Sequence, residues 1–381
     1  ILSIVPADFD WIEEYTNGNY EIYTFHNTNQ KAIENFHSIP NFENYVKNCN
    51  TPEILNNIQE EMHPSNNTLR GSLAIIPLFE QKKRIGSIVL CRYENYAFDF
   101  EELQFLRTFA DNMAVAIANS LLLEEAIEKR RYQMELMYAQ NIQKKIIPAQ
   151  FPTIENYSIA GISIPANELG GDYFDLVYLK GGIPTILIGD VSGKGVSSAL
   201  YLAELKGIVL SIASNITTPV ELLIKLNEIL YPNIEKQIFI TLSAISLLDD
   251  EGNIAYIRAG HTPLAIKQNG STQFIAPKGI ALGLATPSIF NNNLDNYTTQ
   301  LNSQDVCFLY SDGLSELWDS QNNEFGEDGV KNIINEDHIA DSQELIDSAM
   351  SNINTFKGDN KLRDDLTIVS IIYLGKNYER K

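Results

Sequence analysis

A long stretch without Gly or Pro, running from Asp99 to Ile147, constrains the fold of this chain more than any other sequence feature. Apolar residues with helical spacing follow it, at Phe105, Phe109, Met113 and Ile117 and again at Ile127, Met134, Ile142 and Ile146. Pro148 cannot continue a helix. We therefore predict one long helix that ends before Pro148, with a folded region on either side.

The later part of this helix, within residues 124–150, is expected to be a helical coiled-coil and switch linker. Its apolar stripe is narrow. Its other positions carry both acidic and basic residues, with three consecutive basic residues at Lys129, Arg130 and Arg131. A helix of this kind usually packs against a partner helix, so we expect a homodimer formed through the linker and the first domain. The alternative is a solvated spacer.

The first region, residues 1–123, is rich in short runs of β-branched and aromatic residues. Runs at 19–27, 72–80 and 84–93 predict strands of one antiparallel sheet, and 36–48 and 51–62 carry helical spacing. No catalytic cluster is present in the sequence of this region. The chain opens in strand-like sequence without a methionine, so we expect it to be part of a longer protein.

The second region, residues 151–381, alternates apolar strands with hairpin-type turns. Two consecutive helices are predicted at 197–213 and 220–231, between strands at 157–164, 173–180, 185–191, 239–249, 253–261, 305–313 and 365–374. Regular strand–helix alternation is missing, which argues against a doubly wound parallel sheet. We predict an α+β chain whose second domain has stacked antiparallel sheets covered by helices.

Composition narrows the functional classes. The chain has 49 acidic and 28 basic side chains, for a net charge of −21, which argues against a surface that binds duplex nucleic acid or an anionic membrane. An apolar content of 44% excludes disorder throughout, and no run approaches a membrane span. Three scattered cysteines without CxxC spacing fit reduced thiols in a cytoplasm.

Four aspartates share one setting, at or beside the end of an apolar strand. They are Asp172, Asp190, Asp312 and Asp364. Two bare carboxylates about 5 Å apart repel by roughly 3 kcal/mol at an effective dielectric near 20, so several that converge need a cation. Oxygen ligands favour Mg²⁺ or Mn²⁺, and no His/Cys spacing supports zinc. Alternatively, each aspartate only caps a turn, although four in one half-chain favour a metal site.

Two other motifs are superficial matches. The segment GDVSGKG (189–195) lacks the spacing of a phosphate-binding loop, and Gly195 stands where that loop needs Ser or Thr. The segment GGDYFD (170–175) differs from the diguanylate cyclase signature in its fourth letter, Tyr173. Neither motif predicts nucleotide chemistry.

The ordered set resembles the metal-dependent (PPM) serine/threonine phosphatases, in the bacterial branch typified by the SpoIIE and RsbU regulators. Six segments carry the resemblance: AQNIQKKIIPAQFP (139–152), PANELGGDYFD (165–175), GDVSGKGVSSAL (189–200), RAGHTPLAI (258–266), YSDGLSE (310–316) and DDLT (364–367). This resemblance implies an αββα sandwich and a two-metal phosphatase that hydrolyses phosphoserine or phosphothreonine.

The resemblance also implies residue roles. Asp190 would bridge two Mn²⁺ or Mg²⁺ ions, and the carbonyl of Val191 would be a ligand of the second ion. Asp312 and Asp364 would hold the first ion, and Asp172 would anchor the second directly or through water. Asp190, Asp312 and Asp364 form the expected catalytic set.

Neighbouring residues are expected to play lesser parts. Lys194 either contacts phosphate or, as we favour, is a solvated turn lysine. A structural role is favoured over general-acid catalysis for His261. Ser192, Ser311 and Asp365 are candidates for supporting the ligands, with Asp365 pointing to the side opposite Asp364.

Residues 72–125 resemble the later part of a GAF sensor domain, through strand, turn, strand and an FEELQFLRTFA helix. A related PAS-like sensor remains open, as does a domain that serves only for dimerisation. The family resemblance implies that the linker helix moves against a second helix, here 197–213, and so controls metal binding. The implied substrate is a phosphorylated anti-sigma-factor antagonist of the STAS type.

A rival hypothesis from another class is a catalytically silent module that senses a ligand and holds a partner. Retention of all four aspartates favours the enzyme. Residues 1–150 carry a net charge of −7 and residues 151–381 one of −14, so we expect bound metal, and no basic patch, to attract the phosphate.

Overall fold

The computed structural model describes residues 5–16, 19–62, 70–80, 83–336 and 339–376. The strand-like residues 1–4 and the turn residues 81–82 of the GAF-like segment lie outside this part. The chain divides into two compact units, Ile1–Tyr132 and Gln133–Lys381, with the division inside one long helix. Each unit has its own cores.

The N-terminal unit is built on one five-stranded antiparallel sheet with the strand order β2-β1-β5-β4-β3. Its strands are β1 (Phe9–Thr16), β2 (Asn19–His26), β3 (Glu53–Leu55), β4 (Ser72–Glu80) and β5 (Lys83–Arg92). Side chains on both faces of β4 and β5 are buried, because helices cover both sides of the sheet.

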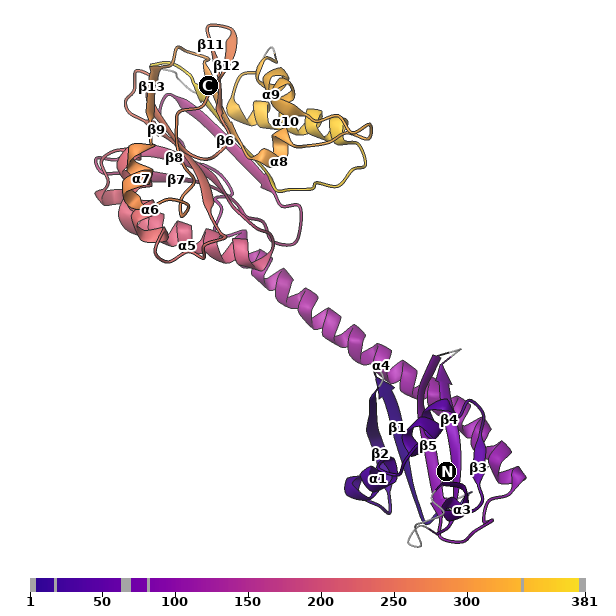
Figure 1. Cartoon of the computed structure of the whole chain (residues 1–381). Helices are drawn as coiled ribbons and strands as arrows, with labels where there is room; N and C mark the ends of the chain where they lie inside the picture. Colours follow the sequence, from indigo (N-terminus) through magenta and orange to yellow (C-terminus); the bar gives the residue numbers. More distant parts are fainter. Residues whose placement is uncertain (1–4, 17–18, 63–69, 81–82, 337–338, 377–381) are drawn as a thin grey trace. The chain divides into compact units, whose positions relative to one another are not determined.

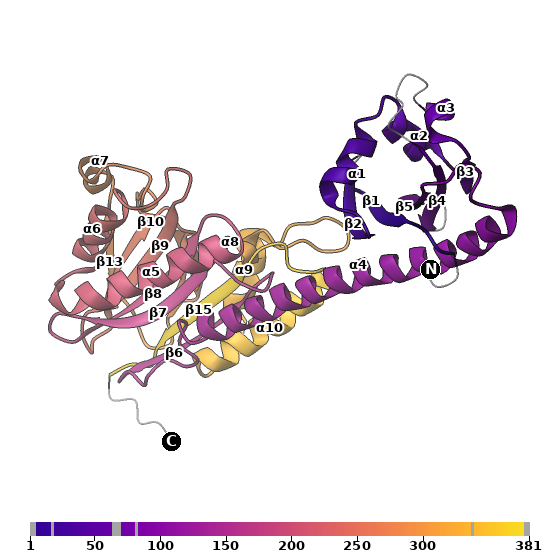
Figure 2. The same ribbon diagram turned by 90° about the horizontal axis from the view of Figure 1, so that it is seen from below.

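Three short helices cover one face of this sheet: α1 (Gln30–His37), α2 (Phe42–Asn48) and α3 (Ile58–Met62). They bury Ile33, Phe42 and Ile58 against Trp11 and Val89. The first part of α4 (Phe100–Gln143) covers the other face, where Leu106, Ala110 and Ala114 pack on the sheet. Figure 2 shows α4 on the side of the sheet opposite α1 and α2.

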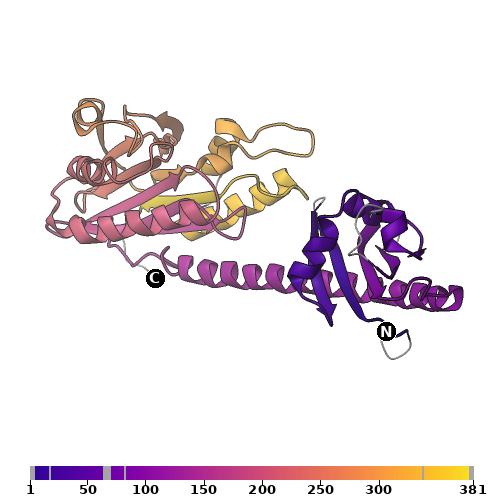
Figure 3. The ribbon, with the colours of Figure 1, turned by 60° about the horizontal axis from the view of Figure 1, so that its bottom comes forward.

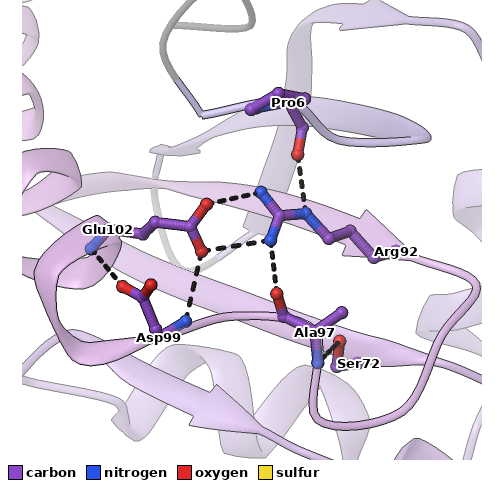
Figure 4. Close-up of polar contacts among 6 residues, drawn as sticks. All are labelled: Pro6, Ser72, Arg92, Ala97, Asp99 and Glu102. Atoms are coloured by element: carbon purple, nitrogen blue, oxygen red, sulfur yellow. Dashed lines mark hydrogen bonds and ion pairs between the residues drawn. The ribbon is translucent and has the colours of Figure 1, made fainter.

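Polar contacts fix the first turn of α4 (Figure 4). Asp99 and Glu102 form a reciprocal cap, in which each backbone N–H donates to the other's carboxylate, at 3.1 and 2.8 Å. Arg92, at the end of β5, donates to both carboxylate oxygens of Glu102, at 3.0 and 2.8 Å. The same guanidinium donates to the carbonyls of Pro6 and Ala97. The helix therefore begins at a defined place on the sheet.

Two helical segments predicted for this unit were wrong in extent. The segment 36–48 is interrupted by residues 38–41, where Asn41 has a φ of +66° and starts a new helix. The segment 51–62 contains β3 before a short helix, because Ile54 and Leu55 pair with β4. Pairing with a neighbouring strand overrode the local helical spacing.

The long helix is confirmed: α4 runs without interruption from Phe100 to Gln143 (Figure 3). It continues into hydrogen-bonded turns as far as Ile146, shortly before Pro148. Several large apolar side chains on its later part are exposed, among them Leu123, Ile127, Met134, Met137 and Ile142.

The C-terminal unit has two five-stranded sheets, with orders β13-β10-β9-β8-β7 and β12-β11-β14-β15-β6. The strands of the first are β7 (Asp172–Leu179), β8 (Ile183–Val191), β9 (Ile240–Leu247), β10 (Asn253–Ala259) and β13 (Asn296–Gln300). Those of the second are β6 (Tyr157–Ile164), β11 (Leu264–Gln268), β12 (Ser271–Ile275), β14 (Val306–Tyr310) and β15 (Leu366–Tyr373). All pairings are antiparallel, as predicted.

Helices cover both outer faces of this sandwich, as Figure 1 shows. One side carries α5 (Val196–Ile212), α6 (Pro219–Leu230) and α7 (Pro287–Asn292), and the other carries α8 (Asp312–Ser315), α9 (Gly326–Ile334) and α10 (Ser342–Lys357). Side chains such as Ile188, Ile245, Leu309 and Val369 fill the space between the sheets. The predicted αββα architecture is confirmed.

One helix in the described part of the chain, Val196–Asn215, is long and apolar enough to cross a membrane by length and composition alone. Its Leu202, Leu205 and Val209 are fully buried in the core between α5 and the first sheet. A core helix passes the same test, so the finding is weak evidence for a membrane span.

Candidate metal centre and active site

The four predicted aspartates come from elements at one edge of the sandwich. Asp172 begins β7 and lies directly opposite Asp190, near the end of β8. Strand alternation places both on the face of Phe174 and Ile188, which is the face between the sheets. Asp312 follows β14, and Asp364 precedes the neighbouring strand β15.

The carboxylates of Asp190, Asp312 and Asp364 lie close enough together to affect one another's pKa values. Burial and, after it, the charges of Asp312 and Asp364 raise the pKa of Asp190 to about 7. The pKa of Asp312 is also raised, first by burial and then by Asp364. Such mutual effects arise between like charges that are close together.

Asp172 is the most deeply buried of the four, with 2% of its surface exposed. Burial, followed by the charge of Asp190, raises its pKa well above the ordinary value. Neither carboxylate oxygen has a hydrogen-bond partner among the described residues. The hydroxyls of Ser311 and Thr367 lie near enough to offset part of the rise in its pKa, but Ser311 donates to the carbonyl of Asp365 at 3.1 Å and Thr367 to Ser163 at 2.7 Å.

Two glycines keep the backbone close to these carboxylates. A Cβ on Gly171 would lie 2.8 Å from the carbonyl oxygen of Val191 and 3.0 Å from Oδ1 of Asp190. A Cβ on Gly313 would lie 2.0 Å from the carbonyl oxygen of Asp365. The space beside Asp190 and Val191 therefore depends on residues without side chains.

Asp365 has a more definite role than the sequence indicated. Its carboxylate accepts hydrogen bonds from the backbone N–H groups of Ala166, at 2.8 Å, and Gly171, at 2.6 Å. It thereby fixes the loop that leads into Asp172. The sequence contained no direct signal for this contact, because the two segments lie far apart along the chain.

Lys194 is not a free solvated lysine. Its ammonium pairs with Asp364 at 2.9 Å and donates to the carbonyl of Arg363, also at 2.9 Å, while its side chain remains 58% exposed. The hydrogen bond to Asp364 raises the pKa of Lys194.

His261 fits the predicted structural role. It is buried, and burial, aided by the charge of Arg258, lowers its pKa to about 3. Its Nδ1 lies 2.9 Å from the hydroxyl of Thr241, which donates at 3.4 Å to the carbonyl of Asp190. A histidine that is neutral at pH 7 has no proton to give as an imidazolium. Ser192 is also structural, because its hydroxyl accepts from the N–H of Phe239.

The residues fit oxygen-ligated divalent ions. A fully buried carboxylate without a hydrogen-bond partner, opposite a second one whose pKa is about 7, is costly unless a cation is bound. Within the described ranges, no three His, Cys, Asp or Glu side chains already surround a single point as ligands. The four aspartates thus lie at one edge of the sandwich, but their side chains do not yet surround a single point.

Comparison with solved structures defines the class of the C-terminal unit. The SiaA-PP2C domain of Pseudomonas aeruginosa matches with a TM-score of 0.53 at 21% identity, covering 65% of this chain and 99% of that domain. The RsbU and RsbW domains of a Mycobacterium tuberculosis protein match with a TM-score of 0.50 at 19% identity, covering 61% of this chain and 64% of that one. The unit has a PP2C-type phosphatase fold.

Sequence comparison then identifies the family. The model of Stage II sporulation protein E (SpoIIE) matches residues 182–373, and the GAF domain model matches residues 11–117. Phosphoserine phosphatase RsbU of Bacillus subtilis is 27% identical over 243 residues, which are 63% of this chain and 70% of RsbU. The chain belongs to the SpoIIE family of metal-dependent protein serine/threonine phosphatases and carries an N-terminal GAF domain.

Proposed function

We propose that this chain hydrolyses phosphoserine or phosphothreonine on a small signalling protein of the anti-sigma-factor antagonist (STAS) type. One observation carries the proposal above all: Asp172, buried and without a hydrogen-bond partner in the described part of the chain, lies directly opposite Asp190. The three free cysteines are all buried, in keeping with a cytoplasmic protein.

Asp190 would serve two Mn²⁺ or Mg²⁺ ions, Asp312 and Asp364 would hold the first, and Asp172 with the carbonyl of Val191 would hold the second. Two such ions would supply an activated water and a clamp for phosphoryl oxygens. Asp365 orients the loop before Asp172, and His261 supports the backbone at Asp190 through Thr241.

The end of the linker helix supports regulation of this site. Gln143, the last residue of α4, is 8% exposed, and its side chain forms two hydrogen bonds with the backbone of Gly170. Its Nε2 donates to the Gly170 carbonyl at 2.6 Å, and its Oε1 accepts from the Gly170 N–H at 3.2 Å. Gly170 is two residues from Asp172, so movement of α4 would move a proposed metal ligand.

Helix α5, the proposed partner in the switch, is tied to the same region. Lys206 of α5 pairs with the buried Asp175 at 3.1 Å and donates to the carbonyl of Ile146, just beyond α4. A signal received by the GAF domain would reach the site through this helix pair, with the exposed apolar stripe of α4 forming the contact between two copies of the chain.

The test is hydrolysis of p-nitrophenyl phosphate and of a phosphorylated STAS protein, with Mn²⁺ or Mg²⁺ and with chelator. We expect metal-dependent turnover that Asp190→Ala abolishes, while Asp347→Asn, an exposed change on α10, leaves it intact. If neither substrate is hydrolysed with Mn²⁺ or with Mg²⁺, the proposal is refuted. The chain would then be a binding module without catalytic activity.

A further inference from the structure

A cleft beside the aspartates gathers basic side chains within this acidic protein. It encloses about 560 Å³ and is formed by the segment after α8, the segment before β15 and the turn at Lys194. Its lining residues include Lys194, Lys361, Arg363, Trp318, Glu316 and Asp364. Lys361 and Arg363 in this lining were not among the residues expected near the site from the sequence.

The charges in this cleft are unequal. Lys194 and Asp364 pair with each other, at 2.9 Å. Neither Lys361 nor Arg363 has an ion-pair partner among the described residues, and both are exposed. Glu316 is the other acid of the lining and comes from the segment after α8, whereas Lys361 and Arg363 come from the segment before β15. The wall formed by Lys361 and Arg363 is therefore positive.

Contacts between side chains and backbone hold the walls of the cleft together. The guanidinium of Arg363 lies over the ring of Trp318, 5.5 Å from its centroid. The side-chain amide of Asn360 donates to the carbonyl of Trp318 at 3.3 Å, and Lys194 donates to the carbonyl of Arg363 at 2.9 Å. These contacts join the three segments that form the walls.

We propose that this cleft binds an acidic segment of the protein substrate next to the phosphorylated residue, with Lys361 and Arg363 facing its carboxylates. The inference rests on the proposed phosphatase function and adds a specificity site to it. Asp364 belongs both to the cleft and to the aspartate cluster, and an extended chain advances about 3.3 Å per residue. The acidic side chains therefore lie within a few positions of the phosphoserine.

The experiment compares two phosphoserine peptides that differ only in flanking residues, Glu in one and Lys in the other, at saturating Mn²⁺. We expect the chain to prefer the acidic peptide about tenfold in kcat/KM, with a smaller preference at high salt. Lys361→Glu and Arg363→Glu should each reduce or invert the preference. Lys331→Glu, an exposed change on α9 outside the cleft, should preserve it.

Arg363 adjoins a proposed metal ligand, so the Mn²⁺ concentration for half-maximal rate is measured for every variant. Lys361→Glu, farther along the chain from Asp364, separates loss of peptide recognition from loss of metal. Equal rates on both peptides, or variants that keep the wild-type preference, would overturn the inference and leave the phosphatase assignment standing. No turnover on either peptide would overturn the inference, and a further lack of turnover on p-nitrophenyl phosphate and the phosphorylated STAS protein would overturn both.

Discussion

The positions of individual carboxylates at strand ends were predictable because the residues that determine them are adjacent in the sequence. The apolar strand before Asp190 and Asp312 and the small residues beside them place each side chain at a sheet edge. The role of Asp365 and the positive wall of Lys361 and Arg363 were not predictable in this way, because their partners lie on segments far away in the sequence. Only the fold brings those segments together.

Removing metal should make stability depend on pH through Asp190. Its folded-state pKa, about 7, is above the ordinary value of 3.8, so the folded protein keeps a proton that the unfolded chain loses. The contribution of Asp190 to the free energy of unfolding of the metal-free protein should therefore fall as pH rises from about 4 to 7, by at most about 4 kcal/mol.

Urea unfolding of the chelated protein across this pH range measures the effect. Asp190→Asn should flatten the decline, whereas the exposed Asp347→Asn should not. Mn²⁺ should restore stability above pH 7 because it binds the folded state. A metal-free protein that becomes more stable between pH 4 and 7, with no difference in Asp190→Asn, would contradict the electrostatic description.

A methyl group at Gly313 should damage the site. The added Cβ would meet the carbonyl oxygen of Asp365 at 2.0 Å, and only backbone movement beside Asp364 can relieve the contact. We expect Gly313→Ala to cost about 1–3 kcal/mol of stability and most of the activity. Gly207→Ala is the matched control: its Cβ would meet no atom within 4 Å, and in a helix it should stabilise by up to about 1 kcal/mol. Equal effects of the two changes in thermal unfolding would refute this reasoning.

At the scale of elements, the long helix and most strands of the C-terminal unit agree with their sequence periods. The errors fell at 36–48, where residues 38–41 interrupt the helix, and at 51–62, where β3 pairs with β4 in spite of the helical spacing. The two ends of α4 are held by side chains whose partners could not be read from a helical period, namely Arg92 with Glu102 and Gln143 with Gly170.

Loss of the Gln143 contact should weaken metal binding more than folding. Gln143→Ala removes two hydrogen bonds to Gly170, worth about 1–2 kcal/mol together. The Mn²⁺ concentration for half-maximal activity should rise roughly 5- to 30-fold, while kcat at saturating Mn²⁺ changes less. Asn141→Ala, at an exposed neighbouring position, is the control. An unchanged metal requirement would separate α4 from the metal centre.

Loss of Arg92 should destabilise the N-terminal unit. Arg92→Ala leaves the partly buried carboxylate of Glu102 without its bidentate partner, at an expected cost of about 2–3 kcal/mol. Glu101→Ala, an exposed change in the same turn, should cost much less. Hydrogen exchange of amides in β4 and β5 reports on this unit separately, and equal exchange in the two variants would contradict the proposed anchor.

At the scale of the whole molecule, we expect a dimer. The stripe of Leu123, Ile127, Met134 and Met137 on α4 is exposed in the single chain. Light scattering should give the mass of two chains, and Ile127→Asp combined with Met134→Asp should shift it to one chain. Glu128→Gln, on the same helix, should leave the dimer intact. A monomer mass for the unaltered chain would refute the prediction.

The central claim is that Asp172, Asp190, Asp312 and Asp364 hold two divalent ions. A crystal soaked in Mn²⁺ and measured for anomalous scattering tests it most directly. We expect two peaks at the edge of the sandwich, both about 2.1 Å from carboxylate oxygens of Asp190, one shared with Asp312 and Asp364 and one near Asp172 and the Val191 carbonyl. Strong peaks elsewhere, with none beside Asp190, would contradict it.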